Sequence, residues 1–158
     1  MNEDLINLTK NTVEMLGFTP VEIKILKSKN NSILKIVIYN KNNDISIDDC
    51  ANVSNVLLRR IELDYPNFSN YYSIIVESPG VDRKLKTIEE ISIFVGKEIK
   101  FNISDIKKYN LKENVVVGLI EKVENNKILI KKNNEILIFD YDDIKNPCLY
   151  FDIKKYLK

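Results

Sequence analysis

The sequence predicts an α+β protein with an N-terminal open sandwich, ordered helix, strand, strand, helix, strand, and a C-terminal five-stranded β-barrel. Three observations predict this class. The first half alternates between helical and strand periodicity, the second half contains short strands at close spacing, and 158 residues suffice for two small domains. We therefore expect an N-terminal domain over residues 1–84 and a C-terminal domain over residues 85–158.

The first domain opens with a helix followed by two strands. Apolar residues recur at helical spacing over residues 3–16, and Gly17 follows where a C-terminal cap glycine belongs. Apolar and polar residues then alternate over residues 21–26 and again over residues 34–39, as in half-buried strands. The polar stretch between them, at residues 29–32, predicts a hairpin loop.

A second helix and a third strand complete this domain. Ser46 can accept a hydrogen bond at a helix start, and Asp49 three residues later gives a variant of the capping box, which predicts a helix over residues 47–63. Alternating apolar residues over 72–76 predict the third strand, which runs into Ser-Pro-Gly at 78–80. Together these five elements make a small sandwich of helices on one face of a sheet.

The second domain begins with a short helix and continues with strands. Thr87 and Glu90 predict another capping box, and Gly96 predicts the end of the helix. Five short strands are expected, over residues 99–103, 115–119, 128–130, 136–138 and 148–150. A single helical turn is expected at residues 142–145. Five antiparallel strands in about 55 residues favour a closed barrel, because closure removes exposed edges.

Composition narrows the possible function classes. The chain has no His, which excludes His-based acid–base catalysis, His metal ligands and the usual Ser or Cys triads. Two cysteines cannot form a zinc site alone, and the four glycines form no phosphate-binding loop. We expect no catalytic site, metal or cofactor. The net charge is +1, so any nucleic-acid contact must use a local patch.

A compositional bias makes the arginines informative. The chain has 24 Ile, 21 Lys and 20 Asn but only 3 Arg, which is typical of an AT-rich coding sequence. Lysine runs are therefore weak indicators of function, whereas Arg59, Arg60 and Arg83 stand out. The acidic start at residues 1–4 is unlike a signal peptide, and no apolar run approaches the length of a membrane span. We expect a cytoplasmic protein without membrane contact.

The most unusual stretch is residues 77–85, Glu-Ser-Pro-Gly-Val-Asp-Arg-Lys-Leu, at the junction of the two expected domains. Pro79 fixes one backbone torsion and Gly80 permits a positive one, which suits a tight turn at a strand end. Asp82 can orient Arg83 or cap a backbone group. Two interpretations stay open: an interdomain hinge whose charges close the joint, or a docking surface for a partner.

This stretch resembles the Ser-Pro-Gly-Leu-Asp-Arg-Pro-Leu motif of the bacterial ribosome maturation factor RimP family. Three further segments resemble the same family in the same order. They are the helix-to-strand junction at residues 16–18, the second helix at residues 47–54 and the Phe-x-Gly-Lys-x-Val-like entry into the barrel at residues 94–99. The resemblance thus extends over nearly the whole chain.

The resemblance implies an N-terminal α/β domain and a C-terminal Sm-like or SH3-like barrel, in agreement with the pattern of elements. It implies a non-enzymatic assembly factor that binds the free small ribosomal subunit and promotes late rRNA folding and late joining of ribosomal proteins. The implied partners are rRNA and the ribosomal protein at the decoding side, the twelfth of the small subunit. We expect the protein to be a monomer in isolation.

The candidate site residues follow from the motif and from charge. Candidates for the partner-docking or interdomain surface are Ser78, Pro79, Gly80, Asp82 and Arg83. Candidates for contacts with rRNA phosphates are, by charge alone, Arg59, Arg60, Lys84 and Lys86. Lys84 stands where the family motif has Pro, which predicts a less rigid connection between the domains.

Two other function classes are weighed against an assembly factor. A single-stranded RNA-binding regulator built on the Sm-like half would need an aromatic platform beside a continuous basic groove on the barrel. A hydrolase would need a nucleophile with its base, and the sequence offers no such pair. The surface charge of the barrel distinguishes the first of these from an assembly factor.

Overall fold

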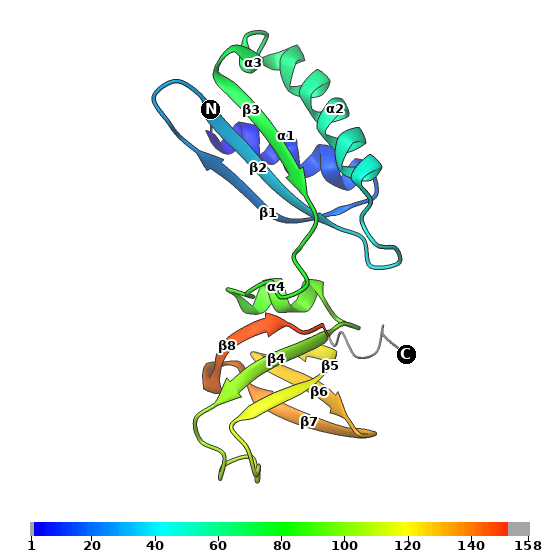
Figure 1. Ribbon diagram of the computed structural model, residues 1–158, viewed down its shortest axis with the longest axis vertical. Coiled ribbons are helices and arrows are strands. Elements are labelled where there is room, and N and C mark those ends of the chain that lie inside the picture. The colour runs from blue at the N-terminus through cyan, green and yellow to red at the C-terminus, as the bar shows by residue number, and fades with distance from the viewer. Residues whose placement is uncertain (1, 152–158) are drawn as a thin grey trace. The chain divides into compact units, whose positions relative to one another are not determined.

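The computed structural model describes residues 2–151 and contains two compact units, Met1–Pro79 and Gly80–Lys158 (Figure 1). The sequence places the domain division after residue 84. In the structure, residues 80–84 group with the second unit, in which Lys84 forms an antiparallel β-bridge with Cys148.

The N-terminal unit contains three helices and three strands. In chain order they are α1 (Asn2–Met15), β1 (Thr19–Leu26), β2 (Ser32–Tyr39), α2 (Ile47–Asp64), α3 (Phe68–Tyr71) and β3 (Tyr72–Glu77). Strands β1 and β2 form an antiparallel hairpin, and β3 pairs with β2 in parallel because α2 carries the chain back along the sheet. The expected order of helices and strands is confirmed, and the one-turn helix α3 is added to it.

Side-chain caps define where α2 begins. The Asp49 backbone N–H donates to Ser46 Oγ at 3.0 Å, and the Ser46 N–H donates to the Asp49 carboxylate at 2.9 Å. Both halves of the expected capping box are therefore present. At the end of α1, Gly17 has the positive φ of 91° that the sequence predicts for a cap glycine.

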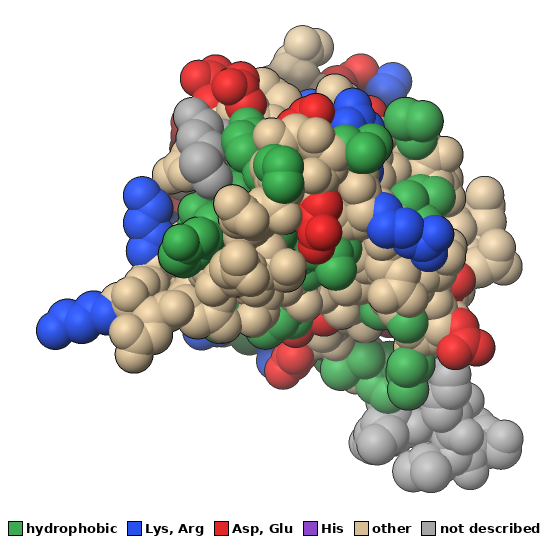
Figure 2. All heavy atoms as spheres, turned by 90° about the horizontal axis from the view of Figure 1, so that it is seen from above, with side chains coloured by type: hydrophobic (Ala, Val, Ile, Leu, Met, Phe, Trp, Pro, Cys, Tyr) green, Lys and Arg blue, Asp and Glu red, His purple; other side chains and the backbone are tan. Residues whose placement is uncertain are grey.

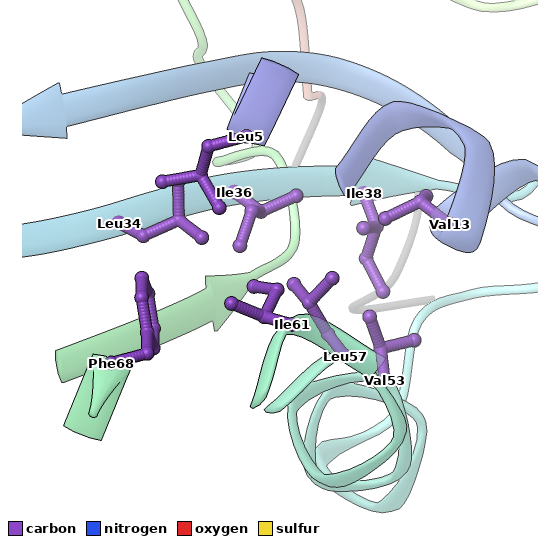
Figure 3. Close-up of a cluster of buried hydrophobic side chains, with 9 residues drawn as sticks. All are labelled: Leu5, Val13, Leu34, Ile36, Ile38, Val53, Leu57, Ile61 and Phe68. Carbon is purple, nitrogen blue, oxygen red and sulfur yellow. The ribbon is translucent and has the colours of Figure 1, made fainter. Parts of the chain in front are cut away.

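The core of this unit lies between the two long helices and one face of the sheet (Figure 3). The buried side chains come from α1, β2, α2 and α3. They are Leu5, Val13, Leu34, Ile36, Ile38, Val53, Leu57, Ile61 and Phe68. Thr9 and Thr12 of α1 are also buried on this apolar face. Their hydroxyls donate to the carbonyls of Leu5 and Leu8, respectively, each at 2.8 Å, so neither polar group is left without a partner. Each buried aliphatic side chain contributes roughly 1.5–3 kcal/mol.

The described part of the C-terminal unit, residues 80–151, contains a short helix and five antiparallel strands. They are α4 (Ile88–Ile93), β4 (Glu98–Ile103), β5 (Val115–Glu124), β6 (Lys127–Lys132), β7 (Glu135–Asp140) and β8 (Ile144–Leu149), with the 3₁₀ turn η1 (Tyr141–Asp143) before β8. The strand order is β7-β6-β5-β4-β8. The expected number of strands and the expected helical turn before the last strand are confirmed.

The sheet of this unit is strongly curled. Phe101 on β4 and Phe139 on β7 are separated by two strands, which in a flat sheet is a distance of about 14 Å. Their ring centroids nevertheless lie 5.1 Å apart in an edge-to-face contact. Strands β7 and β8 form the two edges of the sheet among the described strands. Closure into a full barrel stays a prediction.

Two asparagine pairs make the hairpin turns of this sheet. Asn125 and Asn126 connect β5 to β6, and Asn133 and Asn134 connect β6 to β7. All four have φ between 50° and 66°, the left-handed backbone that two-residue type I′ hairpins require. These turns fix the register of three neighbouring strands.

Apolar residues lie on both faces of two strands. On β5 the buried side chains are Val116 and Ile120, with Gly118 between them. On β7, Phe139 is fully buried, whereas 48% of Ile136 and 53% of Ile138 is exposed. The sequence predicts these two strands from alternate apolar residues in the ranges 115–119 and 136–138. Those residues lie on the outer face of the sheet.

Candidate docking site

A tight turn begins the C-terminal unit. The Arg83 backbone N–H donates to the Gly80 carbonyl oxygen at 3.2 Å, which closes a four-residue turn. Gly80 is not among the residues with positive φ, so this turn does not use the left-handed torsion that a glycine permits. A Cβ at Gly80 would meet only Asp82 Oδ1, at 3.6 Å.

A buried ion pair holds this turn against α4. Arg83 Nε donates to Glu90 Oε1 at 2.6 Å, and only 14% of the Arg83 side chain and 10% of the Glu90 side chain are exposed. The other Glu90 oxygen accepts from the Lys86 N–H at 3.3 Å, while the Glu90 N–H donates to Thr87 Oγ1 at 3.1 Å. Glu90 thus links the Arg83 side chain, the Lys86 N–H and the Thr87 hydroxyl, all within residues 83–90.

This arrangement differs from two expectations. Thr87 caps α4 as expected, but the Glu90 carboxylate reaches Lys86 and Arg83, which leaves the capping box half formed. Glu90 also takes the orienting role that the sequence gives to Asp82. Asp82 itself is exposed and makes no hydrogen bond or ion pair with the described residues. Only the fold brings Glu90, seven residues away, to Arg83.

Residues 83–85 continue as a short extension alongside β8. The Leu149 N–H donates to the Arg83 carbonyl at 2.9 Å, and the Leu85 N–H donates to the Pro147 carbonyl at 2.8 Å. Leu85 is 2% exposed and anchors the extension in the core. The alternation of a strand then directs Lys84 and Lys86 outward, and both are exposed.

The candidate docking residues separate into two groups. The structure brings Gly80, Asp82 and Arg83 together in one turn, with Asp82 exposed and Arg83 directed inward. Ser78 and Pro79 follow β3 at the end of the N-terminal unit. The side chain of Val81, which the sequence does not single out, is 62% exposed in the turn.

The candidate phosphate-binding arginines lie on α2 in the N-terminal unit, whereas Lys84 and Lys86 belong to the C-terminal unit. Arg59 and Arg60 line a shallow hollow on the outer face of the helix, together with Val56, Glu62 and Leu63. Arg60 pairs with Asp64 at 3.6 Å, one helical turn away. Arg59 has no acidic partner among the described residues.

A second charged cluster lies at the other end of the C-terminal sheet. Lys108 Nζ contacts Asp140 at 3.2 Å and Asp143 at 2.7 Å, and Lys127 Nζ contacts Asp140 at 2.6 Å. The Tyr109 hydroxyl donates to the Asp143 carboxylate and accepts from the Asp140 N–H. This cluster ties the loop between β4 and β5 to the end of β7.

The ion pairs shift the pKa values within this cluster. The hydrogen bond with Lys127, and then that with Lys108, lowers the pKa of Asp140, and the bonds with Lys108 and Tyr109 lower the pKa of Asp143. The two carboxylates raise the pKa of Lys108. Partial burial and the bond with Asp143 raise the pKa of Tyr109. At neutral pH, Lys108 is therefore protonated, and Asp140 and Asp143 are ionised.

Residues 2–151 contain no group of three His, Cys, Asp or Glu side chains placed to hold a metal ion. No helix in that range is long and apolar enough to cross a membrane.

Comparison with known proteins identifies the family. The family model of the RimP N-terminal domain matches residues 8–82. The ribosome maturation factor RimP of Borreliella afzelii strain PKo is 31% identical over 150 residues, which cover 94% of both chains. That of Borrelia turicatae strain 91E135 is 28% identical over 148 residues, 94% of this chain and 95% of the relative. The chain therefore belongs to the RimP family of ribosome maturation factors.

Proposed function

We propose that the protein binds the free small ribosomal subunit and promotes late folding of its rRNA and late joining of ribosomal proteins. The observation that carries this proposal is the 31% identity with a ribosome maturation factor over 94% of both chains. In this proposal the protein acts in the cytoplasm. It binds the assembling particle and holds it in one conformation. No catalytic step is invoked.

The turn at the start of the C-terminal unit supports a docking role. Its backbone is fixed by the Arg83–Glu90 pair and by the bonds to β8, so its exposed groups are held before a partner arrives. We assign Arg83 as a positioning residue and Asp82 as a contact residue for the ribosomal protein at the decoding side. Ser78, Pro79 and Gly80 complete the proposed docking motif.

Contacts with rRNA phosphates are assigned to Arg59, Arg60, Lys84 and Lys86, all of which are exposed. On the face shown in Figure 2, Lys and Arg side chains are interspersed with Asp and Glu side chains, so no broad basic area is in view. A few local phosphate contacts fit this distribution better than binding by bulk charge.

The single-stranded RNA regulator receives less support from the C-terminal unit. Lys108 and Lys127 are paired with carboxylates, and the Tyr109 ring packs against Phe139 with centroids 4.8 Å apart. These side chains are therefore already engaged within the protein. Lys108, Lys127 and Tyr109 are thus not available as parts of a basic groove beside an open aromatic platform.

Cosedimentation in sucrose gradients tests the proposed function. The full-length protein is mixed with purified small subunits, large subunits or joined ribosomes at one salt concentration. We expect recovery with free small subunits and little recovery with joined ribosomes. Equal recovery with joined ribosomes would contradict an assembly role. Arg59→Gln and Lys86→Gln should each weaken the binding and reduce its salt dependence, because each removes one phosphate contact.

A further inference from the structure

The edge strand β7 has unpaired backbone groups. It pairs with β6 on one side, and no described strand pairs with its other side. In a two-residue hairpin the residues that flank the turn, here Lys132 and Glu135, form a hydrogen-bonded pair, and bonded and non-bonded pairs then alternate. Ile136 and Ile138 consequently direct their N–H and C=O groups away from β6, toward the free edge.

A contact at the end of β7 supports this assignment. Asp140 is the next residue whose backbone should face the free edge, and its N–H donates to the Tyr109 hydroxyl at 3.1 Å. Tyr109 comes from the loop between β4 and β5, so it covers the end of the edge. The free stretch therefore runs from Ile136 to Ile138 and offers two N–H and two C=O groups.

The side chains of this stretch are also unusual for an edge. Ile136 is 48% exposed and Ile138 is 53% exposed, both on the outer face of the sheet. Edge strands in stable monomers commonly carry Lys, Pro or a bulge that prevents pairing with another chain. Residues 136–138 carry neither Lys nor Pro, and the β6–β7 register has no shift. This regular, apolar edge is suited to accept another strand.

The chemistry of the edge selects a polypeptide over RNA. Backbone donors and acceptors that repeat every second residue match another extended polypeptide. Lys108 and Lys127, which lie at the end of β7, are paired with carboxylates and offer little free positive charge to phosphates. On β6 the exposed Lys132 lies opposite Glu135 and the exposed Lys131 lies opposite Ile136, so charges of both signs lie beside the free stretch. An extended segment that places apolar side chains over Ile136 and Ile138 is complementary to this arrangement.

The size of the edge argues against a second copy of this chain. Stable protein pairs bury about 1,200–2,000 Å² in total, far more than a three-residue edge with two isoleucines can supply. A short strand addition becomes effective when the added segment is held nearby by other contacts, as in a large assembly. The suitable occupant is therefore a segment of a protein already bound in the particle.

We propose that the free edge of β7 binds an extended segment of a ribosomal protein as an added strand, with apolar side chains at alternate positions over Ile136 and Ile138. This proposal rests on the proposed function, which brings the protein to an assembling subunit. It adds a second protein contact on the C-terminal unit, made by residues outside the family motif.

Two variants and one control test the proposal. Ile138→Lys places a charge on the free edge, and Ile138→Pro removes an N–H that faces it while leaving the ladder with β6 intact. Ile75→Lys is the matched control, because Ile75 is 42% exposed on an edge strand of the other sheet. We expect each Ile138 variant to bind purified small subunits about tenfold more weakly, and the control to bind within about twofold of the wild type. Urea midpoints of all variants confirm folding.

Amide hydrogen exchange of the peptide that spans residues 135–140 gives a second readout. We expect protection when small subunits are added to the wild-type protein. If the wild type fails to bind small subunits, both this proposal and the proposed function fail. If the wild type and Ile138→Lys bind equally and the peptide stays unprotected, only the β7 proposal fails. Protection by protein-free rRNA, or dimerisation of the free protein that Ile138→Lys abolishes, would also overturn it.

Discussion

At the scale of single residues, the junction motif depends on a buried charge pair. Arg83 and Glu90 are 14% and 10% exposed, so each charge depends on the other for compensation. Such a pair adds little net stability compared with apolar residues, but the loss of one partner leaves an unpaired buried charge. The most informative arginine in the sequence is thus directed into its own unit, and its exposed neighbours are free to contact a partner.

Charge reversal at Arg83 tests this assignment. We expect Arg83→Glu to lower the free energy of unfolding by about 3–5 kcal/mol, because it leaves Glu90 beside a second buried acid. Asp82→Asn is the control, since Asp82 is exposed, and we expect a change within about 0.5 kcal/mol. Urea midpoints and subunit binding are measured for both. An unchanged midpoint with lost binding for Arg83→Glu would instead make Arg83 a direct docking residue.

Gly118 gives a second residue-scale prediction. A Cβ at this position would lie 2.4 Å from Ile130 Cγ2 and 3.0 Å from the Lys131 carbonyl oxygen, so β5 and β6 would have to separate. We expect Gly118→Ala to destabilise the protein by about 1–3 kcal/mol. Gly80→Ala is the matched control, because its Cβ has room and its φ is not positive. Equal urea midpoints for the two variants would contradict this packing.

At the scale of elements, ion pairs hold the loop between β4 and β5 in place. The pKa values of Asp140 and Asp143 are lowered in the folded protein, so their stabilisation is present above the unfolded carboxyl pKa and is lost as pH falls through the folded values. The pKa of Lys108 is raised, so its contribution is lost only as pH rises through the folded value, well above neutrality. We expect the loop to loosen below about pH 4.

Carbon-13 titration of the carboxyl groups tests the cluster. We expect Lys108→Met to raise the pKa of both Asp140 and Asp143 toward the ordinary value, because the hydrogen-bonded cation is removed. Lys122→Met is the control, since Lys122 pairs with Glu124 at 3.0 Å and not with the cluster. Unchanged titration of both aspartates in Lys108→Met would show that Lys108 does not hold them.

Most elements could be predicted from the sequence because their signals are local. Capping residues, cap glycines and alternation gave α1, α2 and the three strands of the first sheet. The inner face of β5 and β7 could not be predicted in this way. Apolar residues occupy both faces of these strands, so alternation does not determine which set is buried. Burial is decided by the hairpin registers and by the curl of the sheet.

The candidate site was predicted only where its signal lies in one segment. The motif at residues 77–85 marked the turn, but the partner of Arg83 comes from the following helix. The Lys108 cluster joins residues 32 and 35 positions apart, and lysine is too common here for such pairs to be noticed. The free edge of β7 depends on strand order, which no local pattern encodes.

At the scale of the whole molecule, each unit has its own sheet and its own buried core. Independent cores predict independent folding. We expect residues 1–79 and residues 80–158 each to give dispersed amide resonances when expressed alone. Collapsed resonances for either fragment at neutral pH would show that this unit depends on the other.

The position of the division is tested by a shorter fragment. A fragment of residues 85–158 lacks Arg83, so it leaves Glu90 without its buried partner and removes the bonds from residues 83–85 to β8. We expect it to be less stable than residues 80–158 by about 3–5 kcal/mol, measured from urea midpoints. Equal midpoints would favour the division after residue 84.

The asparagines in the hairpin turns are sensitive to single-base changes in their codons. Asparagine occupies every non-glycine position with positive φ among the described residues, including both hairpin turns of the C-terminal sheet. A single base change converts an Asn codon into an Ile or Lys codon, and both kinds of change retain an AT-rich codon. A β-branched residue such as Ile is among the least tolerated side chains in left-handed backbone. Asn→Ile at any of these four turn positions therefore threatens the register of β5, β6 and β7, although the positions are exposed.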